Sequence, residues 1–319
     1  MRKTPLLALM LALMFTTWAL ALSTPARAAD KLTVLLEWFV NPDHAPLVVA
    51  KQLGLFEKQG LDVELVAPSD PSSVPRLVAA GQADVGVHYQ PALYLDHAAG
   101  LPIVRFATLV ETPLNGITIL ADGPVKTLAD LKGKTVGYSV SGFETALLGR
   151  MLANAGIAIG DVELVNVNFA LTPALISGKV DATVGSYRNF ELTQMRIEGR
   201  EGRIFYPEEH GVPVYDELIF VTRKELEKDG RLPRFLAAIE DATLYLTNHP
   251  QEAWKRFIAA YPDLDNELNR QAWLDTLPRF AKRPAALDSS RYERFGAFLV
   301  EEKLIDKAPA VSDITIEVR

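Results

Sequence analysis

The sequence predicts an α/β protein with two similar lobes, and three observations carry this prediction. Short β-rich runs alternate with helical patterns from residue 32 onward, which is typical of parallel sheets built from strand–helix–strand units. The chain has 319 residues, of which 49% are apolar, enough for one large core or two medium ones. Residues 175–185 resemble residues 77–86, which indicates that a second lobe repeats the design of the first.

The first unit begins with a strand at residues 32–36, followed by a turn at residues 41–46. Apolar residues at helical spacing predict a helix over residues 47–59, which Gly60 ends. Residues 61–65 alternate as the second strand. The pattern continues with helices at 74–80 and 92–99 and strands at 83–87 and 103–107.

A new strand–helix pattern starts at residues 128–137 and continues to the echo at 175–185. The character changes after residue 224, where strand-like stretches become few and helical runs dominate. These runs cover residues 233–246, 251–260, 267–274 and 290–301. We expect them to form a helical cap on one lobe.

The N-terminus has the features of a secretory signal. Arg2 and Lys3 precede an uncharged run over residues 6–22, and Ala26-Arg27-Ala28 offers small residues at the two specificity positions of a cleavage site. A single membrane anchor is the alternative, which is disfavoured by Pro25 and Arg27 soon after the run and by the lack of a basic cluster. We expect residues 1–28 to be a cleaved signal peptide and the mature chain to be exported.

Composition excludes several classes of function. The sequence contains no cysteine, so disulfides, thiolate metal sites, thiol catalysis and a lipoprotein tether are absent, which favours a periplasm bounded by an outer membrane. A net charge of -7 argues against nucleic-acid binding. Neither a phosphate-binding loop motif nor a metal-ligand run is present, so we expect no cofactor and no metal.

Three segments, residues 50–63, 77–86 and 130–137, resemble landmarks of the type II solute-binding proteins that feed ABC importers. This resemblance implies two α/β lobes with a ligand cleft between them and chain crossings near residues 115–120 and 217–221. Lobe 1 would comprise residues 29–116 and 220–319, and lobe 2 residues 117–219. It also implies an ABC permease and its ATPase in the inner membrane as partners.

Residues 36–47 and 185–191 resemble loops of the branch that binds thiamine pyrimidine precursors, formylaminopyrimidine or hydroxymethylpyrimidine. This branch is related to pyrimidine precursor synthases and to sulfonate- and nitrate-binding proteins. Ala45 and Pro46 replace its usual threonine and glycine, and Val40 stands where proline is common. The alternative cargoes are an alkanesulfonate, nitrate, riboflavin or another small aromatic molecule.

A synthase function is the third hypothesis, because a eukaryotic relative builds the pyrimidine from its own histidine and pyridoxal phosphate. The resemblance places His44 in that histidine region. The relative uses iron and a cysteine-rich motif, however, and this chain has no cysteine. We therefore expect binding without catalysis.

An aminopyrimidine has two apolar faces and a polar edge, so its site needs aromatic walls and a carboxylate or amide. Trp38, Tyr89 and Tyr187 are the candidates for the walls, with a place in the core as the alternative for Trp38. Glu191 is a candidate to accept a hydrogen bond from the exocyclic amine, unless it is a solvated helix residue. The loop after the first strand offers Asn41 and His44, and His44 could instead cap a helix.

A loop between a strand and a helix adds the candidates Ser139, Ser141, Gly142 and Glu144, since amides at a helix N-terminus point into such a cleft. In sulfonate- and nitrate-binding relatives this position holds an oxyanion, whereas in the pyrimidine branch it would hold ring substituents or a phosphate. Arg188 turned inward beside this loop would favour an oxyanion. Three aromatic walls on one cleft would favour the pyrimidine.

Overall fold

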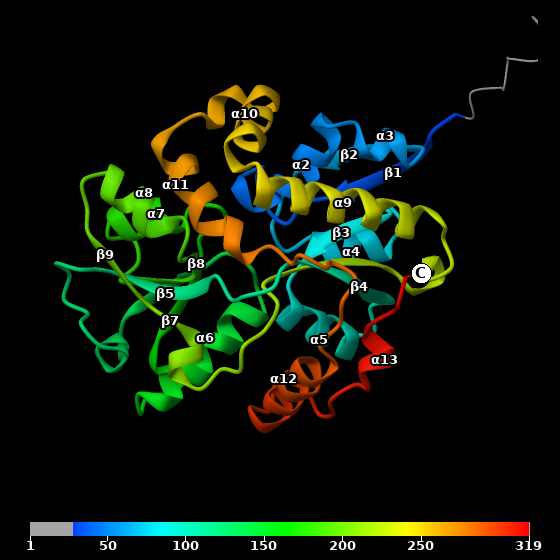
Figure 1. Cartoon of the computed structure of the whole chain (residues 1–319). Helices are drawn as coiled ribbons and strands as arrows, with labels where there is room; N and C mark the ends of the chain where they lie inside the picture. The colour runs from blue at the N-terminus through cyan, green and yellow to red at the C-terminus, as the bar shows by residue number, and fades with distance from the viewer. Residues whose placement is uncertain (1–27, 319) are drawn as a thin grey trace, which may run out of the picture.

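The structure is a computed structural model that describes residues 28–318. The expected signal peptide lies outside the described residues, apart from Ala28. Two five-stranded sheets organise the chain, each with helices packed on it (Figure 1).

The first sheet has the order β2-β1-β3-β10-β4. β1 is parallel to both of its neighbours, whereas β10 is antiparallel to β3 and β4. The strands of this sheet are β1 (Asp30–Leu35), β2 (Leu61–Val66), β3 (Val85–His88), β4 (Ile103–Val110) and β10 (Leu218–Arg223). The connecting helices are α2 (Ala45–Gln52), α3 (Leu55–Lys58), α4 (Val74–Ala79) and α5 (Gln90–Ala98).

The second sheet repeats this design with the order β7-β6-β8-β5-β9. Again three parallel strands continue into an inserted antiparallel strand, here β5. Its strands are β5 (Asn115–Leu120), β6 (Thr135–Tyr138), β7 (Glu163–Asn166), β8 (Ala182–Tyr187) and β9 (Gly202–Phe205), with helices α6 (Phe143–Asn154), α7 (Leu171–Ile176) and α8 (Glu191–Ile197). The α/β class and the repeated design predicted from the sequence are confirmed.

The chain passes between the sheets at residues 111–114 and 206–217. The first crossing ends just before the expected residues and the second ends at Glu217, the first of its expected range, because β5 and β10 are already paired within their sheets from Asn115 and Leu218. Glu217 ties the crossings together: its Oε2 accepts hydrogen bonds from the amides of Leu114 (2.5 Å) and Asn115 (3.0 Å). The exact lobe boundaries stay a prediction.

The helical C-terminal part is confirmed. It consists of α9 (Arg231–Asn248), α10 (Pro250–Ala260), α11 (Glu267–Thr276), α12 (Ser289–Glu301) and α13 (Val311–Ile314). α9 and α10 pack against α2, on the first-sheet unit, whereas α11 lies beside α8 of the second unit (Figure 1). The cap therefore reaches across both units, and the expectation of a cap on one lobe is wrong.

The prediction of one continuous helix over residues 47–59 is wrong, because the structure has two shorter helices there. α2 ends at Gln52 and α3 starts at Leu55, because Gly54 between them has a left-handed backbone with φ of 65°. Glycine adopts this conformation without steric cost, so the chain turns sharply here. The break directs Phe56 into the core, where its ring stacks on Phe235 at 5.5 Å.

Candidate functional site

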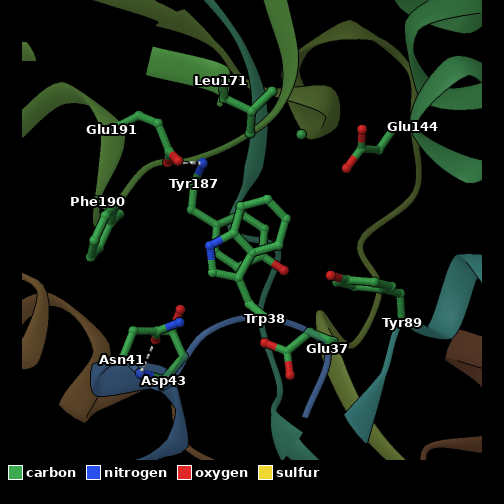
Figure 2. Close-up of a pocket in the computed structure, with 11 residues that line it drawn as sticks. Glu37, Trp38, Asn41, Asp43, Tyr89, Glu144, Leu171, Tyr187, Phe190 and Glu191 are labelled. Atoms are coloured by element: carbon green, nitrogen blue, oxygen red, sulfur yellow. Dashed lines mark hydrogen bonds between the residues drawn. The ribbon is translucent and has the colours of Figure 1, made fainter. Parts of the chain in front are cut away.

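A cavity lies between the two sheets, at the carboxyl ends of β1, β3 and β8 (Figure 2). Open α/β sheets bind ligands at this edge. The lining residues are aromatic, acidic or small: Glu37, Trp38, Asn41, Asp43, Tyr89, Glu144, Leu171, Gly185, Tyr187, Phe190 and Glu191. Among these described lining residues there is no lysine, arginine or histidine.

The loop after β1 is fixed by its own side chains. Asn41 Oδ1 accepts a hydrogen bond from the amide of Asp43 (2.8 Å), and His44 Nδ1 accepts one from the amide of Asn41 (3.2 Å). This reciprocal cap starts the short turn η1 (Pro42–His44), with Pro42 at its first position. The cap holds Asn41 and Asp43 at the cavity and turns His44 into the protein.

His44 is fully buried and pairs with Glu37, which is 2% exposed. Its Nε2 lies 3.0 and 2.9 Å from the two carboxylate oxygens of Glu37. Since Nδ1 accepts from Asn41, the proton of the neutral ring sits on Nε2 and is donated to Glu37. Burial lowers the pKa of His44, but the charge and hydrogen bond of Glu37 outweigh it, so the pKa is raised above its usual 6.5.

Asp43 connects the two units across the cavity. Its Oδ1 accepts hydrogen bonds from Asn189 Nδ2 (2.7 Å), after β8, and from Thr276 Oγ1 (2.8 Å), on α11. Asn189 Nδ2 also contacts Thr276 Oγ1 at 2.7 Å. Burial raises the pKa of Asp43 to about 6, although these hydrogen bonds oppose the shift.

Two carboxylates of the second unit are held by backbone amides. Glu144 Oε2 accepts hydrogen bonds from the amides of Ser139 (2.8 Å) and Val140 (3.0 Å). Glu191 Oε2 accepts one from the amide of Tyr187 (2.5 Å) (Figure 2). Burial is the largest cause that raises the pKa of each carboxyl group to about 8. Both groups are therefore able to carry a proton near neutral pH.

Aromatic rings complete the cavity and its rim. Tyr89 stacks on Phe143 with ring centroids 4.7 Å apart. The ring of Trp38 meets the ring of Phe169, which precedes α7, edge-on at 4.6 Å. The ring of the half-exposed Phe39 lies 4.3 Å from that of Phe169. Because Trp38 and Phe169 come from different units, this contact joins the two sides at the rim.

Tyr187 is the third aromatic residue of the cavity. Its hydroxyl oxygen is buried and interacts with the side chain of Tyr89, but without a well-formed hydrogen bond. Burial, the largest cause, and nearby carboxylates raise its pKa well above 10, so the hydroxyl remains a donor. A buried donor without a well-formed hydrogen bond costs free energy, which a bound polar ligand would recover.

Six of the ten site residues predicted from the sequence line this cavity: Trp38, Asn41, Tyr89, Glu144, Tyr187 and Glu191. His44 does not, because it pairs with Glu37 inside the protein. Ser139 is buried with its hydroxyl on the carbonyl of Asn168. Ser141 and Gly142 are exposed and line a separate depression beside α5.

Five lining residues were not singled out from the sequence: Glu37, Asp43, Leu171, Gly185 and Phe190. Four of them lie inside the segments that carried the resemblance. Glu37 directly follows the buried end of the first strand, and a carboxylate there is a detectable signal because charged residues are rarely buried without a partner. Leu171 has no comparable signal in the sequence.

Within residues 28–318, no group of three or more His, Asp or Glu side chains is arranged to hold a metal ion. No helix in this part of the chain is both long and apolar enough to cross a membrane.

Two matched α/β units with a cavity between their strand ends define the periplasmic-binding-protein fold. An alkanesulfonate-binding protein, SsuA from Xanthomonas axonopodis pv. citri, solved with bound MOPS, has this fold. It matches with a TM-score of 0.71 over 91% of this chain and 99% of its own, at 17% identity.

The chain belongs to the NMT1/THI5-like family, whose model matches residues 41–253. A Haemophilus influenzae protein named for thiamine biosynthesis is 49% identical over 94% of this chain and 96% of its own length. The formylaminopyrimidine-binding protein of Halalkalibacterium halodurans is 34% identical, covering 79% and 78%. A 4-amino-5-hydroxymethyl-2-methylpyrimidine phosphate synthase of Legionella pneumophila is 27% identical, covering 87% and 88%.

Proposed function

We propose that this protein is the periplasmic receptor of an ABC importer and binds an aminopyrimidine precursor of thiamine, of the formylaminopyrimidine or hydroxymethylpyrimidine type. The observation that carries the proposal is the cavity itself. Trp38, Tyr89 and Tyr187 surround it together with four carboxylates and no basic side chain among the described lining residues. Aromatic walls suit the ring faces, and carboxylates suit its amine.

The family supports this class of ligand. Relatives named for thiamine biosynthesis and for formylaminopyrimidine binding match at 49% and 34% identity. In the proposed mechanism, ligand binding stabilises the closed arrangement of the two units, and the closed receptor delivers the ligand to the permease and its ATPase. Export by a cleaved signal peptide of residues 1–28 is part of the same proposal.

The charge of the cavity disfavours the anionic cargoes. Arg188, the residue whose inward orientation would favour an oxyanion, does not line the cavity. Its Nη1 lies 2.6 Å from Glu208 Oε1, and its guanidinium packs over the ring of Tyr206 at 4.1 Å. A sulfonate or nitrate would therefore enter a site that is lined by Glu37, Asp43, Glu144 and Glu191 and by no basic side chain among the described lining residues.

The position of His44 favours binding over synthesis. The synthase hypothesis requires an accessible histidine, whereas His44 is fully buried and hydrogen-bonded on both ring nitrogens. The absence of cysteine points the same way.

The test is titration calorimetry on the mature chain, unfolded and refolded to remove carried-over ligand. The panel comprises hydroxymethylpyrimidine, formylaminopyrimidine, thiamine, riboflavin, taurine and nitrate. We expect micromolar or tighter binding of one of the two pyrimidines and no heat from taurine or nitrate. If another ligand gives heat of binding and neither pyrimidine does, only the assignment as a two-lobed receptor would remain.

A further inference from the structure

The loop of residues 139–142 presents backbone amides at the start of α6, a helix of 12 residues. Amides and the helix dipole at such a position ordinarily attract an external anion. Here the amides of Ser139 and Val140 donate to Glu144, the second residue of the same helix. The chain therefore fills this position, the seat, with its own carboxyl group.

The neighbouring strand is shaped to admit this carboxylate. Gly185 in β8 has φ of 97°, and a Cβ added there would lie 2.5 Å from Glu144 Cδ. Any larger residue at this position would displace the carboxylate. Glu144 is 3% exposed, so the carboxylate fills a close-fitting seat between α6 and β8.

The surroundings of the seat are acidic. Besides burial, the nearby Glu217 and Glu191 raise the pKa of Glu144, and no cationic side chain is among the described residues that line the cavity. A phosphate or sulfonate group entering here would find the amides already occupied and no cationic partner in a poorly solvated space, where an unpaired charge is costly.

We propose that Glu144 is the specificity-determining residue that restricts the cavity to uncharged or protonated amino-aromatic ligands, because it occupies the amides that would otherwise bind a phosphate or sulfonate group. This inference rests on the proposed function and deepens it. The receptor takes the unphosphorylated pyrimidine and rejects its phosphate ester.

The experiment compares hydroxymethylpyrimidine with its phosphate ester by calorimetry on the mature, ligand-stripped chain. We expect the wild-type protein to bind the alcohol at least a hundredfold more tightly than the ester. Glu144→Ala vacates the seat and is expected to reduce this preference at least tenfold, mainly by improved binding of the ester. Glu144→Gln keeps the seat filled with an uncharged side chain and is expected to reduce this preference less than Glu144→Ala does.

Glu201→Ala, at an exposed position of the second unit, is the control and should leave the preference unchanged. Thermal unfolding identifies the variants that fold, and Glu144→Gln decides the question if Glu144→Ala does not. Equal binding of alcohol and ester by the wild-type protein, or an unchanged preference in every folded Glu144 variant, overturns the inference and leaves the proposed function intact. Wild-type protein that binds neither pyrimidine form, but another ligand of the panel, overturns the proposed function itself.

Discussion

The two sides of the cavity hold their carboxylates in different ways. On the first unit, Glu37 pairs with the buried imidazole of His44, and Asp43 accepts from two side chains. On the second unit, Glu144 and Glu191 accept hydrogen bonds only from backbone amides that precede their own helices. A side-chain partner is lost by a single substitution, whereas backbone amides cannot be mutated away. Substitution of a partner residue therefore perturbs the first side, whereas a change in protonation perturbs the second.

The largest effect that we expect is a pH dependence set by the second side. The carboxyl groups of Glu144 and Glu191 have pKa values raised to about 8 from the ordinary 4.5. Between these values the folded state holds protons that the unfolded state releases, so the free energy of unfolding falls as pH rises through this window. Each proton contributes a slope of about 1.4 kcal/mol per pH unit.

Denaturant unfolding of the ligand-free protein from pH 5 to pH 9 measures this slope. Glu191→Gln should flatten it, while Glu240→Gln at an exposed position of α9 should not. Asp43 and Glu217, with pKa values raised by burial to about 6 and 7, act in the same direction over narrower windows. Stability that rises with pH across this range would contradict the protonated state of the second side.

The next effect tests the first side through its buried pair. His44→Leu removes the partner of Glu37 and leaves a carboxylate that is 2% exposed without compensation. We expect the free energy of unfolding to fall by about 3–5 kcal/mol. The double variant Glu37→Leu/His44→Leu should recover most of this loss, as urea titrations would show. A double variant less stable than His44→Leu would mean that packing, and not charge pairing, sets the cost.

The aromatic walls are tested by binding. Trp38→Ala removes a ring from the cavity and breaks its contact with Phe169, so we expect affinity for the pyrimidine to fall tenfold or more, from about 1–3 kcal/mol per stacked face. Trp38→Phe keeps an aromatic face and should lose less. Calorimetry with thermal unfolding as a control measures both. Unchanged affinity in a folded Trp38→Ala would assign the ring to the rim contact alone.

Much of the fold and part of the site followed from local patterns. The alternation of apolar and polar residues and the helix signals predicted both units, because the pattern that identifies each strand or helix lies within about ten residues. Trp38, Tyr89 and Glu191 could be predicted to meet because strand ends converge at one edge of a sheet. The sequence does not show which polar groups hydrogen-bond to one another. The pairing of His44 with Glu37 in the interior was therefore missed.

The same limit explains the loop before α6. The sequence shows donors at a helix N-terminus, but whether they face a ligand or a side chain of the same helix depends on backbone geometry. Here Glu144 folds back onto the amides, and Ser141 and Gly142 point to the surface instead. The decisive feature, the space left by Gly185, is a relation between residues 41 positions apart in the chain.

The smallest effect that we expect comes from the bond that joins the two sides. Asn189→Ala removes a donor from Asp43, which costs about 1 kcal/mol in the closed arrangement and should weaken pyrimidine binding about fivefold. Asn189→Asp places a second carboxyl group against Asp43 and should weaken binding more, with partial recovery below pH 6, where Asp43 gains its proton. Calorimetry at pH 5.5 and 8 measures both variants, and small-angle scattering should show a larger radius for the liganded Asn189→Asp protein at pH 8. Equal binding by Asn189→Asp and wild type at pH 8 would show that this contact does not stabilise closure, and that other contacts, such as those of Trp38 with Phe169 and of Tyr89 with Phe143, join the two units.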